Sequence, residues 1–439
     1  MYYGSMNLWN ESLWGDEAFS AMAVRLPFVE MIKVVMKDTA PPLFYFLGFL
    51  WQRLTGGSEI GLRSLSLILV LTAGIFAGLT VFELGKSKLN GLLAFLLTIF
   101  SPFLFTFAFE WRMYALLSAT ITMSSYAFLT KRWKLYVLGS VLALYTHHFA
   151  VFTIFVQFLV FMVTEFRWRQ PKTWLKTIWP YLAIGLVYSF WLYPMYLQIL
   201  RVKGSGFWLS RPTLNDVVDT SWRLMLGGVG EKWRPLTAGI ILLLLLFKDW
   251  KKVGWKTCQA IIIGMAPIFI SAGLSYVITP IFYDRYLLSV IPMMAVVWTL
   301  GTRKEIKFGV MFLILIYSLG SYARFTNPTK RPFREMAMEI KKEIKDGDLL
   351  LNYNGTAHHI WESKYYKVPA PIYTPGGPLP LYVGTAQMTK EDTTETIPTP
   401  KRRLIVISSE QTSKMVLPGY RMVKENYHQD IGYSVWVKK

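Results

Sequence analysis

Long apolar runs alternate with short polar connections along the chain up to about residue 325. A helix that crosses a bilayer needs roughly 20 mainly apolar residues, and about ten windows approach this length with no charge or with one near an end. They cover residues 62–82, 89–108, 113–130, 135–146, 149–164, 178–197, 236–247, 257–278, 286–300 and 308–323. The pattern predicts a polytopic bundle of transmembrane helices, whose shortest members borrow flanking residues or lie among other helices.

Basic residues cluster in every second connection between these spans. The clusters are Lys86 and Lys88; Lys131, Arg132 and Lys134; Arg167, Arg169 and Lys172; Lys248, Lys251 and Lys252; Arg303, Lys304 and Lys307. Because short loops rich in Lys and Arg stay in the cytoplasm, the intervening connections and both termini are predicted to face outward. The basic residues behind the formal net charge of +20 then set the orientation of the chain in the membrane and contact lipid headgroups. No nucleic-acid partner is expected.

Segment 41–54 is apolar, but it is too short for a comfortable crossing. Counting it as a span would also invert the charge pattern that follows. Its aromatic residues, Phe44, Tyr45, Phe46 and Trp51, suit a helix at headgroup depth. We therefore expect it in the outer interface.

The composition agrees with a bilayer as the main solvent, since 53% of residues are hydrophobic and only 17% are charged. The single cysteine, Cys258, excludes an internal disulfide. Residues 1–17 lack a positively charged leader followed by an apolar core, so no cleavable signal peptide is expected.

After residue 327 the chain takes on the composition of a soluble domain. An amphipathic helix is predicted at 333–345 and a buried strand at 349–353, followed by an irregular Pro- and Gly-rich loop at 369–380. Further strands are predicted at 404–408, 420–425 and 433–438.

The expected fold class is mostly α, a transmembrane bundle with a C-terminal soluble α/β domain. Residues 1–61 are expected to form an outer-face loop with interfacial helices, 62–325 the bundle, and 328–439 an extracytoplasmic domain.

An acidic pair, Asp16 and Glu17, lies beside Trp14 in the first outward segment. Transfer of a sugar from a phosphate to a hydroxyl needs a base for the acceptor's proton and often a cation for the leaving phosphate. Asp16 suits either need. A solvated turn or a helix cap is the alternative for both residues.

A second cluster, Glu110 to Tyr114, stands where a span emerges on the outer face. The guanidinium of Arg112 is able to fork onto phosphate oxygens. Its alternatives are a snorkelling anchor at the helix end or an ion pair with Glu110.

The third and fourth clusters are His147-His148 and Asp284-Arg285, both at outer ends of spans. The imidazoles are able to donate to phosphate or to ligate a metal ion, although adjacent residues point apart and are not expected to share one ion; plain loop histidines are the alternative. An ionisable residue so close to hydrocarbon usually has a partner, which for Arg285 is lipid phosphate or Asp284.

At these residues the chain resembles the GT-C superfamily of integral-membrane glycosyltransferases, close to the protein O-mannosyltransferase and aminoarabinose-transferase-like group. Residues 12–20 resemble its first acidic motif, 38–45 its Pro-Pro-Leu-Tyr-Tyr-type motif, 110–116 its Glu-x-Arg-Met-Tyr-x-Leu signature and 285–287 its late Arg-Tyr-Leu element. The likeness covers roughly residues 12–325.

The resemblance implies a GT-C-type bundle in a plasma or inner membrane, with an active site on the non-cytoplasmic face. Asp16 would be the catalytic base or a metal-site carboxylate, and Glu17 its supporting acid. The donor phosphate would be held by Arg112, Tyr114, His147, His148 and Arg285. The expected partners are a polyprenyl-phosphate sugar, membrane lipids and a hydroxyl-bearing acceptor, and the expected reaction is an inverting transfer.

The chain departs from the family's pattern in two places. The family often has His before the Pro-Pro pair, where this chain has Ala40, which leaves Asp38 or Thr39 as substitutes in any divalent-metal site. The family also begins with a transmembrane helix before the acidic motif, and its absence here suggests a truncated or misassigned start.

Two other classes of protein fit many spans and buried arginines. A transporter or lipid flippase would place ionisable groups at mid-membrane on broken helices, whereas here they gather on one side. In a scaffold that recognises glycans through its C-terminal tail, the four charged clusters would have no catalytic role.

Overall fold

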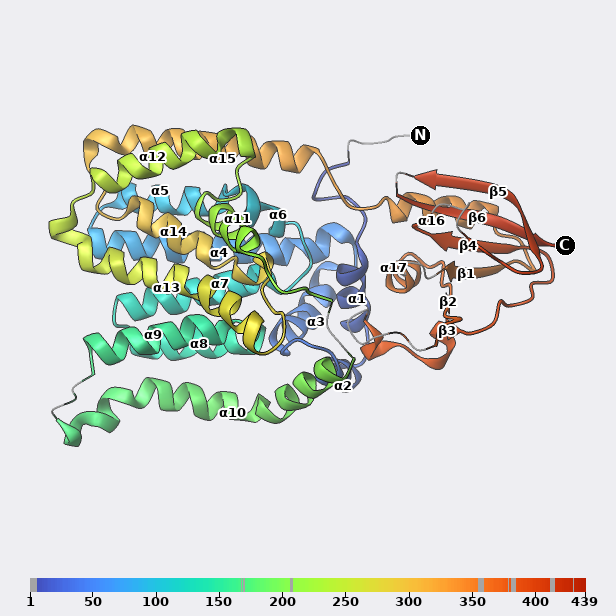
Figure 1. The fold of residues 1–439 in the computed structure, drawn as a ribbon, viewed down its shortest axis with the longest axis horizontal. Coiled ribbons are helices and arrows are strands. Elements are labelled where there is room, and N and C mark those ends of the chain that lie inside the picture. The colour runs from blue at the N-terminus through green and yellow to red at the C-terminus, as the bar shows by residue number, and fades with distance from the viewer. Residues whose placement is uncertain are drawn as a thin grey trace.

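The computed structural model describes residues 6–166, 168, 170–205, 208–353, 359–377, 379, 384–410, 415–428 and 430–439. A long helical bundle and a smaller sheet domain lie end to end, with three N-terminal helices at their junction (Figure 1).

The bundle is built from helices that run along the long axis of the molecule (Figure 1). They are α4 (Glu59–Gly85), α5 (Lys88–Ile99), α7 (Tyr114–Leu129), α8 (Trp133–Thr146), α9 (Ala150–Thr164), α10 (Trp174–Ser205), α12 (Arg234–Leu246), α13 (Trp250–Val277), α14 (Val290–Thr299) and α15 (Lys307–Thr326). Each predicted span contains a helix, because apolar runs of this length satisfy their backbone hydrogen bonds internally only as helices.

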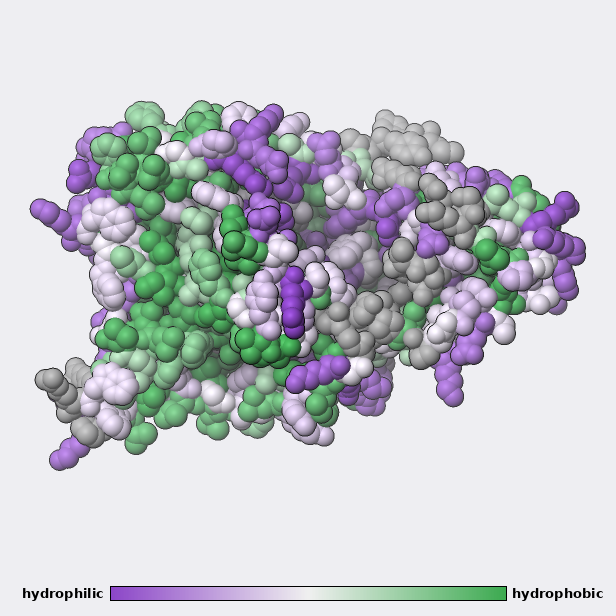
Figure 2. Space-filling view, viewed as in Figure 1, coloured by the Kyte–Doolittle hydropathy of each residue, from purple (hydrophilic) through white to green (hydrophobic). Residues whose placement is uncertain are grey.

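Four of these helices, α4, α10, α13 and α15, are long and apolar enough to cross a membrane. Hydrophobic side chains cover the visible face of the bundle, and hydrophilic ones gather at its far end and over the sheet domain (Figure 2). These helices make the chain an integral membrane protein.

The predicted span 89–108 is wrong as a single helix. It divides into α5 and a short α6 (Pro102–Phe107), with Ser101 between them. Pro102 has no backbone N–H and therefore cannot continue the hydrogen bonds of α5. Ser101 Oγ donates instead to the carbonyl of Gly227 at 2.9 Å, which fixes the bend.

The stretch between α10 and α12 contains a helix that the apolar pattern missed, α11 (Leu214–Met225). Thr213 caps it, with its hydroxyl oxygen accepting the backbone N–H of Asp216 at 3.2 Å. The helix is polar on one face, so a search for continuous apolar windows passes over it.

The basic connections gather at the bundle end far from the sheet domain (Figure 1). Asn90 Nδ2 donates to the carbonyl of Thr302 at 3.1 Å, and Lys248 forms an isolated β-bridge with the same residue. Lys131 pairs with Glu165 at 2.8 Å. Arg167 and Arg169 lie outside the described residues. The basic connections therefore mark one end of the bundle, and the sheet domain lies at the other end.

At the opposite end lie α1 (Gly15–Ala23), α2 (Phe28–Lys37) and α3 (Leu43–Thr55). Segment 41–54, predicted as an interfacial helix, forms most of α3. Phe44 and Tyr45 are fully buried, whereas Phe46 is exposed. The aromatic residues of α3 are thus divided between the protein interior and the surface.

The sheet domain contains α16 (Phe333–Glu343), β1 (Leu349–Tyr353), α17 (Ile360–Tyr365), β2 (Ile372–Tyr373), β3 (Thr393–Thr394), β4 (Leu404–Ser408), β5 (Tyr420–His428) and β6 (Ile431–Lys438). The strand order is β3-β2-β1-β4-β6-β5. The pairs among β3, β2, β1 and β4 are parallel, and β6 is antiparallel to β4 and β5. A mixed sheet with helices matches the predicted α/β domain. The pattern missed α17 and the two-residue strands β2 and β3, and β2 lies within the segment predicted as an irregular loop.

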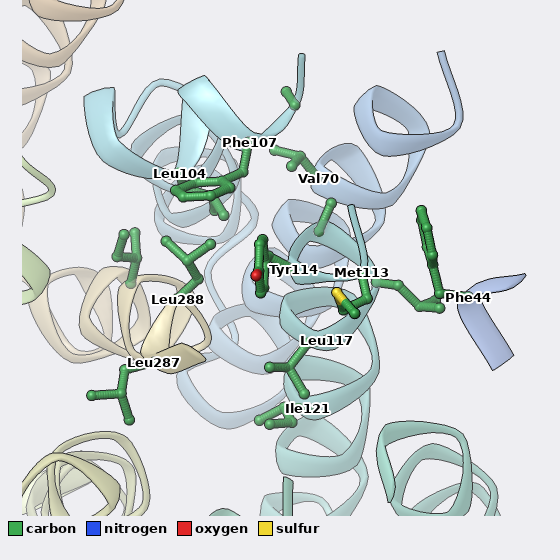
Figure 3. Close-up of a cluster of buried hydrophobic side chains, with 14 of the residues drawn as sticks. Phe44, Val70, Leu104, Phe107, Met113, Tyr114, Leu117, Ile121, Leu287 and Leu288 are labelled. Atoms are coloured by element: carbon green, nitrogen blue, oxygen red, sulfur yellow. The ribbon is translucent and has the colours of Figure 1, made fainter. Parts of the chain in front are cut away.

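A buried apolar cluster fixes the N-terminal end of α7 (Figure 3). Tyr114 lies at its centre, with Phe107 from α6, Leu288 from the segment before α14, and Leu117 from the next turn of α7 around it. This packing holds the start of α7 rigidly where the site begins.

Candidate active site

A cavity of about 1110 Å³ opens where the bundle, the N-terminal helices and the sheet domain meet. Its lining includes most of the predicted site residues: Asp16, Asp38, Arg112, Tyr114, His147, His148 and Arg285. These residues come from segments separated by more than two hundred positions, and the fold brings them into one space. Glu17 is not among the lining residues.

Asp16 lies in the first turn of α1 and faces two guanidinium groups. Its Oδ2 is 3.8 Å from Arg112 Nη2 and 3.6 Å from Arg285 Nη1. Its side chain is 38% exposed, against 12% and 13% for the two arginines. A carboxylate open to the cavity between two buried cations is able to take a proton from one ligand while the cations hold a negative charge on another.

Glu17 points the other way, into the protein. Its carboxylate pairs with Arg63 at 2.8 Å and with Lys330 at 3.0 Å, and it accepts the backbone N–H of Trp111 at 2.7 Å. Burial alone would raise the pKa of Glu17, but Arg63 and Lys330 outweigh it and lower that pKa to about 2. Glu17 also accepts the backbone N–H of Trp14 at 3.4 Å. It is therefore a buried anchor and cap of α1, which matches the helix-cap alternative.

Arg112 reaches into the site and not toward Glu110. Its Nη1 donates to Ser20 Oγ at 2.8 Å and to the carbonyl of Asp16 at 3.2 Å. Glu110 is buried, forms no ion pair among the described residues, and has a pKa raised to about 7 by burial. Asp16 and Ser20 thus position Arg112.

Arg285 lies within the short helix η3 (Asp284–Leu287), which precedes α14. The alternative partner, Asp284, forms its ion pair with Arg223 of α11 instead. Arg285 stacks on the rings of Tyr283 and Tyr114, with its Cζ 4.6 and 5.2 Å from their centroids. These contacts hold its guanidinium in the cavity and leave it available to an anion.

His147 follows α8, and its ring lies 4.7 Å from that of Tyr286. Its Nδ1 accepts the backbone N–H of Phe149 at 3.2 Å. Burial, together with His148, Arg112 and Arg285, lowers the pKa of His147 to about 3. The imidazole is therefore neutral near pH 7 and carries its proton on Nε2, which makes that atom a hydrogen-bond donor.

His148 has both ring nitrogens engaged by protein groups. Its Nε2 lies 3.1 Å from Gln198 Oε1 and its Nδ1 3.4 Å from Tyr188 Oη. Gln198 of α10 in turn donates to the carbonyls of Val35 and Ala40 at 3.0 and 3.2 Å. His148 thus acts through Gln198 to position the loop that carries Asp38.

Asp38 and Asp16 are the candidate metal ligands. Asp38 accepts the hydroxyl of Tyr45 at 3.2 Å, and burial raises its pKa despite the opposing Arg112. Among the described residues, no group of three His, Cys, Asp or Glu is arranged to hold a metal ion. The cationic neighbours of Asp16 also disfavour a divalent cation. These residues do not fit a metal site.

Several residues of the site were not predicted from the sequence. Arg63 could have been predicted, because it stands inside the first apolar span, where an arginine needs a buried partner. No feature of the sequence marks Gln198 or Ser20 as a site residue, since each acts only through a contact made in the folded chain. His359, Trp361 and Glu362 of the sheet domain also line the cavity.

The fold class predicted from the sequence, a helical membrane bundle with a small C-terminal α/β domain, is confirmed by solved structures. The chain superposes on the crystal structure of ArnT from Cupriavidus metallidurans in the apo state with a TM-score of 0.60, 11% identity, and coverage of 98% of this chain and 95% of that one. For the same ArnT bound to undecaprenyl phosphate, the TM-score is 0.56 at 12% identity, with 98% and 96% covered. At these identities the likeness establishes the fold. No protein-family pattern matches the chain, and neither does any curated protein.

Proposed function

We propose that this protein is a glycosyltransferase that moves a sugar from a polyprenyl-phosphate donor to a hydroxyl-bearing acceptor. The observation that carries the proposal is the placement of Asp16 between Arg112 and Arg285 in one cavity. A base beside two phosphate-binding cations is what sugar transfer from a phosphate requires.

The two guanidiniums suit the phosphate of the donor. The Nε atoms of Arg112 and Arg285 are buried and have no hydrogen-bond partner among the described residues. A guanidinium fork binds phosphate oxygens through paired N–H groups, and the Nε2–H of His147 adds a neutral donor. The binding of undecaprenyl phosphate by the similarly folded ArnT supports a polyprenyl carrier.

The proposed reaction is a single inverting displacement. The acceptor oxygen bonds to the anomeric carbon, the bond from that carbon to the phosphate oxygen breaks, and Asp16 takes the acceptor's proton. The polyprenyl phosphate leaves with the bonding electron pair, and Arg112 and Arg285 stabilise its added charge. Glu17 serves by holding α1, and hence Asp16, in place.

The site is proposed to lie on the non-cytoplasmic face of the membrane. It occupies the bundle end opposite the basic connections (Figure 1), and Lys- and Arg-rich loops remain cytoplasmic. The same arrangement disfavours a transporter, whose ionisable groups would stand at mid-membrane.

The test is incubation of the purified protein in detergent with a panel of polyprenyl-phosphate sugars. We expect release of free polyprenyl phosphate that depends on an added acceptor. Retention of every donor intact, with any acceptor, would contradict the proposal.

The same assay tests metal dependence. Because Arg112 and Arg285 supply the positive charge that a metal ion would otherwise provide, we expect EDTA to leave the initial rate unchanged. Loss of the rate with EDTA, and its return with added Mg²⁺ or Mn²⁺, would contradict a metal-independent site.

The variant Arg112→Ala tests the phosphate clamp. Loss of a charge-assisted contact costs roughly 1.5–3 kcal/mol, so the KM for the donor is expected to rise by about tenfold or more. Arg53→Ala on the exposed face of α3 is the control and should retain the wild-type KM. An unchanged donor KM in Arg112→Ala would remove Arg112 from the clamp.

A further inference from the structure

One wall of the cavity comes from the sheet domain. His359, Trp361 and Glu362 line it, at the start of the six-residue helix α17 (Ile360–Tyr365). All three residues are buried, with exposures of 1%, 3% and 6%. The reaction described above uses none of them.

Glu362 and His359 form a pair beside the catalytic segment. His359 Nδ1 lies 3.3 Å from Glu362 Oε1, and the same oxygen lies 3.5 Å from the position that a Cβ would take at Gly15. Gly15 immediately precedes Asp16. The carboxylate of Asp16 faces the two arginines, and the backbone just before it faces Glu362, so Asp16 stands between the phosphate-binding groups and this wall.

Two polar atoms of this wall have no partner in the part of the chain that the structure describes. His359 Nε2 and Trp361 Nε1 are buried and have no hydrogen-bond partner among the described residues. Burying such groups without a partner costs free energy, and both side chains border the cavity. A ligand that enters the cavity is able to supply the missing partners.

The wall suits a ligand with several hydroxyl groups. It offers a carboxylate, an imidazole nitrogen and an indole N–H within four consecutive residues. The Trp361 ring is held in place by an edge contact with Phe19, at 5.5 Å between ring centroids. A serine or threonine side chain presents one hydroxyl, whereas a sugar ring presents several hydroxyls and an apolar face that packs on an aromatic ring.

We propose that His359, Trp361 and Glu362 form the acceptor subsite, and that the acceptor group bound there is a saccharide. This inference rests on the proposed glycosyl transfer and adds the class of its acceptor. The hydroxyl that reacts is the one that reaches Asp16 while its neighbours bind Glu362 and Trp361.

The experiment measures acceptor and donor KM separately for Glu362→Gln and Trp361→Phe. The probes are p-nitrophenyl glycosides and a serine-containing peptide, with the donor that the wild-type protein consumes. Trp361→Phe retains an aromatic ring against Phe19 but removes the indole N–H together with the second ring of the indole. The control is Glu339→Gln, which alters another glutamate–histidine pair of the sheet domain, with His428 at 2.9 Å, away from the cavity lining.

We expect each site variant to raise the glycoside KM by about tenfold or more, with the donor KM unchanged, and the control to match the wild type. A purely structural role of α17 would move both KM values together. An unchanged glycoside KM in Trp361→Phe overturns the subsite even where Glu362→Gln fails to fold, and transfer to the peptide alone overturns the saccharide assignment.

Glycoside binding is also measured without turnover, by saturation-transfer NMR on wild type and Trp361→Phe. A protein that consumes no donor contradicts the proposed function. Binding that weakens in Trp361→Phe supports the subsite, and equal binding, or none to the wild type, overturns it.

Discussion

Replacement of Asp16 by asparagine is expected to lower the rate of sugar transfer by about 10²–10⁴-fold, the range that a positioned general base contributes. Asparagine has nearly the same shape as aspartate but cannot accept the proton of the attacking hydroxyl. Binding of polyprenyl phosphate should persist, because Arg112 and Arg285 remain. Release of polyprenyl phosphate in single-turnover reactions measures the first effect, and direct binding of the free lipid measures the second.

Asp219→Asn provides the matched control. Asp219 lies on α11, is 60% exposed and pairs only loosely with Arg234, at 3.4 Å. Its replacement should leave the transfer rate unchanged. Full activity in Asp16→Asn, with folding and membrane insertion intact, would exclude Asp16 from the chemistry.

Replacement of Arg63 by alanine is expected to give the largest loss of stability. Arg63 is fully buried and holds Glu17 through two bonds of 3.0 and 2.8 Å, while also donating to the carbonyls of Glu11 and Ser12 at 2.7 and 3.1 Å. Breaking a buried ion pair from one side costs about 3–5 kcal/mol, because the remaining charge stays uncompensated. Thermal unfolding in detergent should show the loss.

Acid titration adds a second measurement of the same pair. Because the pKa of Glu17 falls from an ordinary 4.5 to about 2 in the folded protein, its ionised form contributes fully to stability above pH 4.5. That contribution disappears as the pH falls toward 2. The Arg63→Ala variant should lose much of this acid dependence, and Arg53→Ala should retain it. Equal unfolding curves for Arg63→Ala and wild type would contradict the anchoring role.

The apolar pattern predicted most helices of the bundle, because a helix that faces lipid needs a long continuous run of apolar residues. It failed at Pro102, where one apolar run holds two helices, and at α11, which is amphipathic. Strands β1 and β4 have the predicted bounds, since short runs of aliphatic residues in a soluble domain leave little choice of conformation.

The sequence predicted that the motifs of the candidate site lie together on one side of the bundle, but it did not predict the direction of each side chain. Asp16, Arg112 and Arg285 were found because charged residues beside lipid are unusual. The opposite directions of Asp16 and Glu17 were not predictable, since they depend on Arg63 and Lys330 meeting Glu17 behind α1. The contribution of α17 was equally hidden, because its residues are ordinary in a soluble domain and become notable only against Gly15.

Lys330 lies in the short connection between α15 and α16, and its ammonium reaches both Glu11 and Glu17, at 3.3 and 3.0 Å. These ion pairs bind the connection to the N-terminal segment that carries Asp16. The connection is therefore not a flexible linker. A chain shortened before Lys330 would lose a counter-charge for two buried carboxylates along with one wall of the cavity. The sheet domain is accordingly no detachable module.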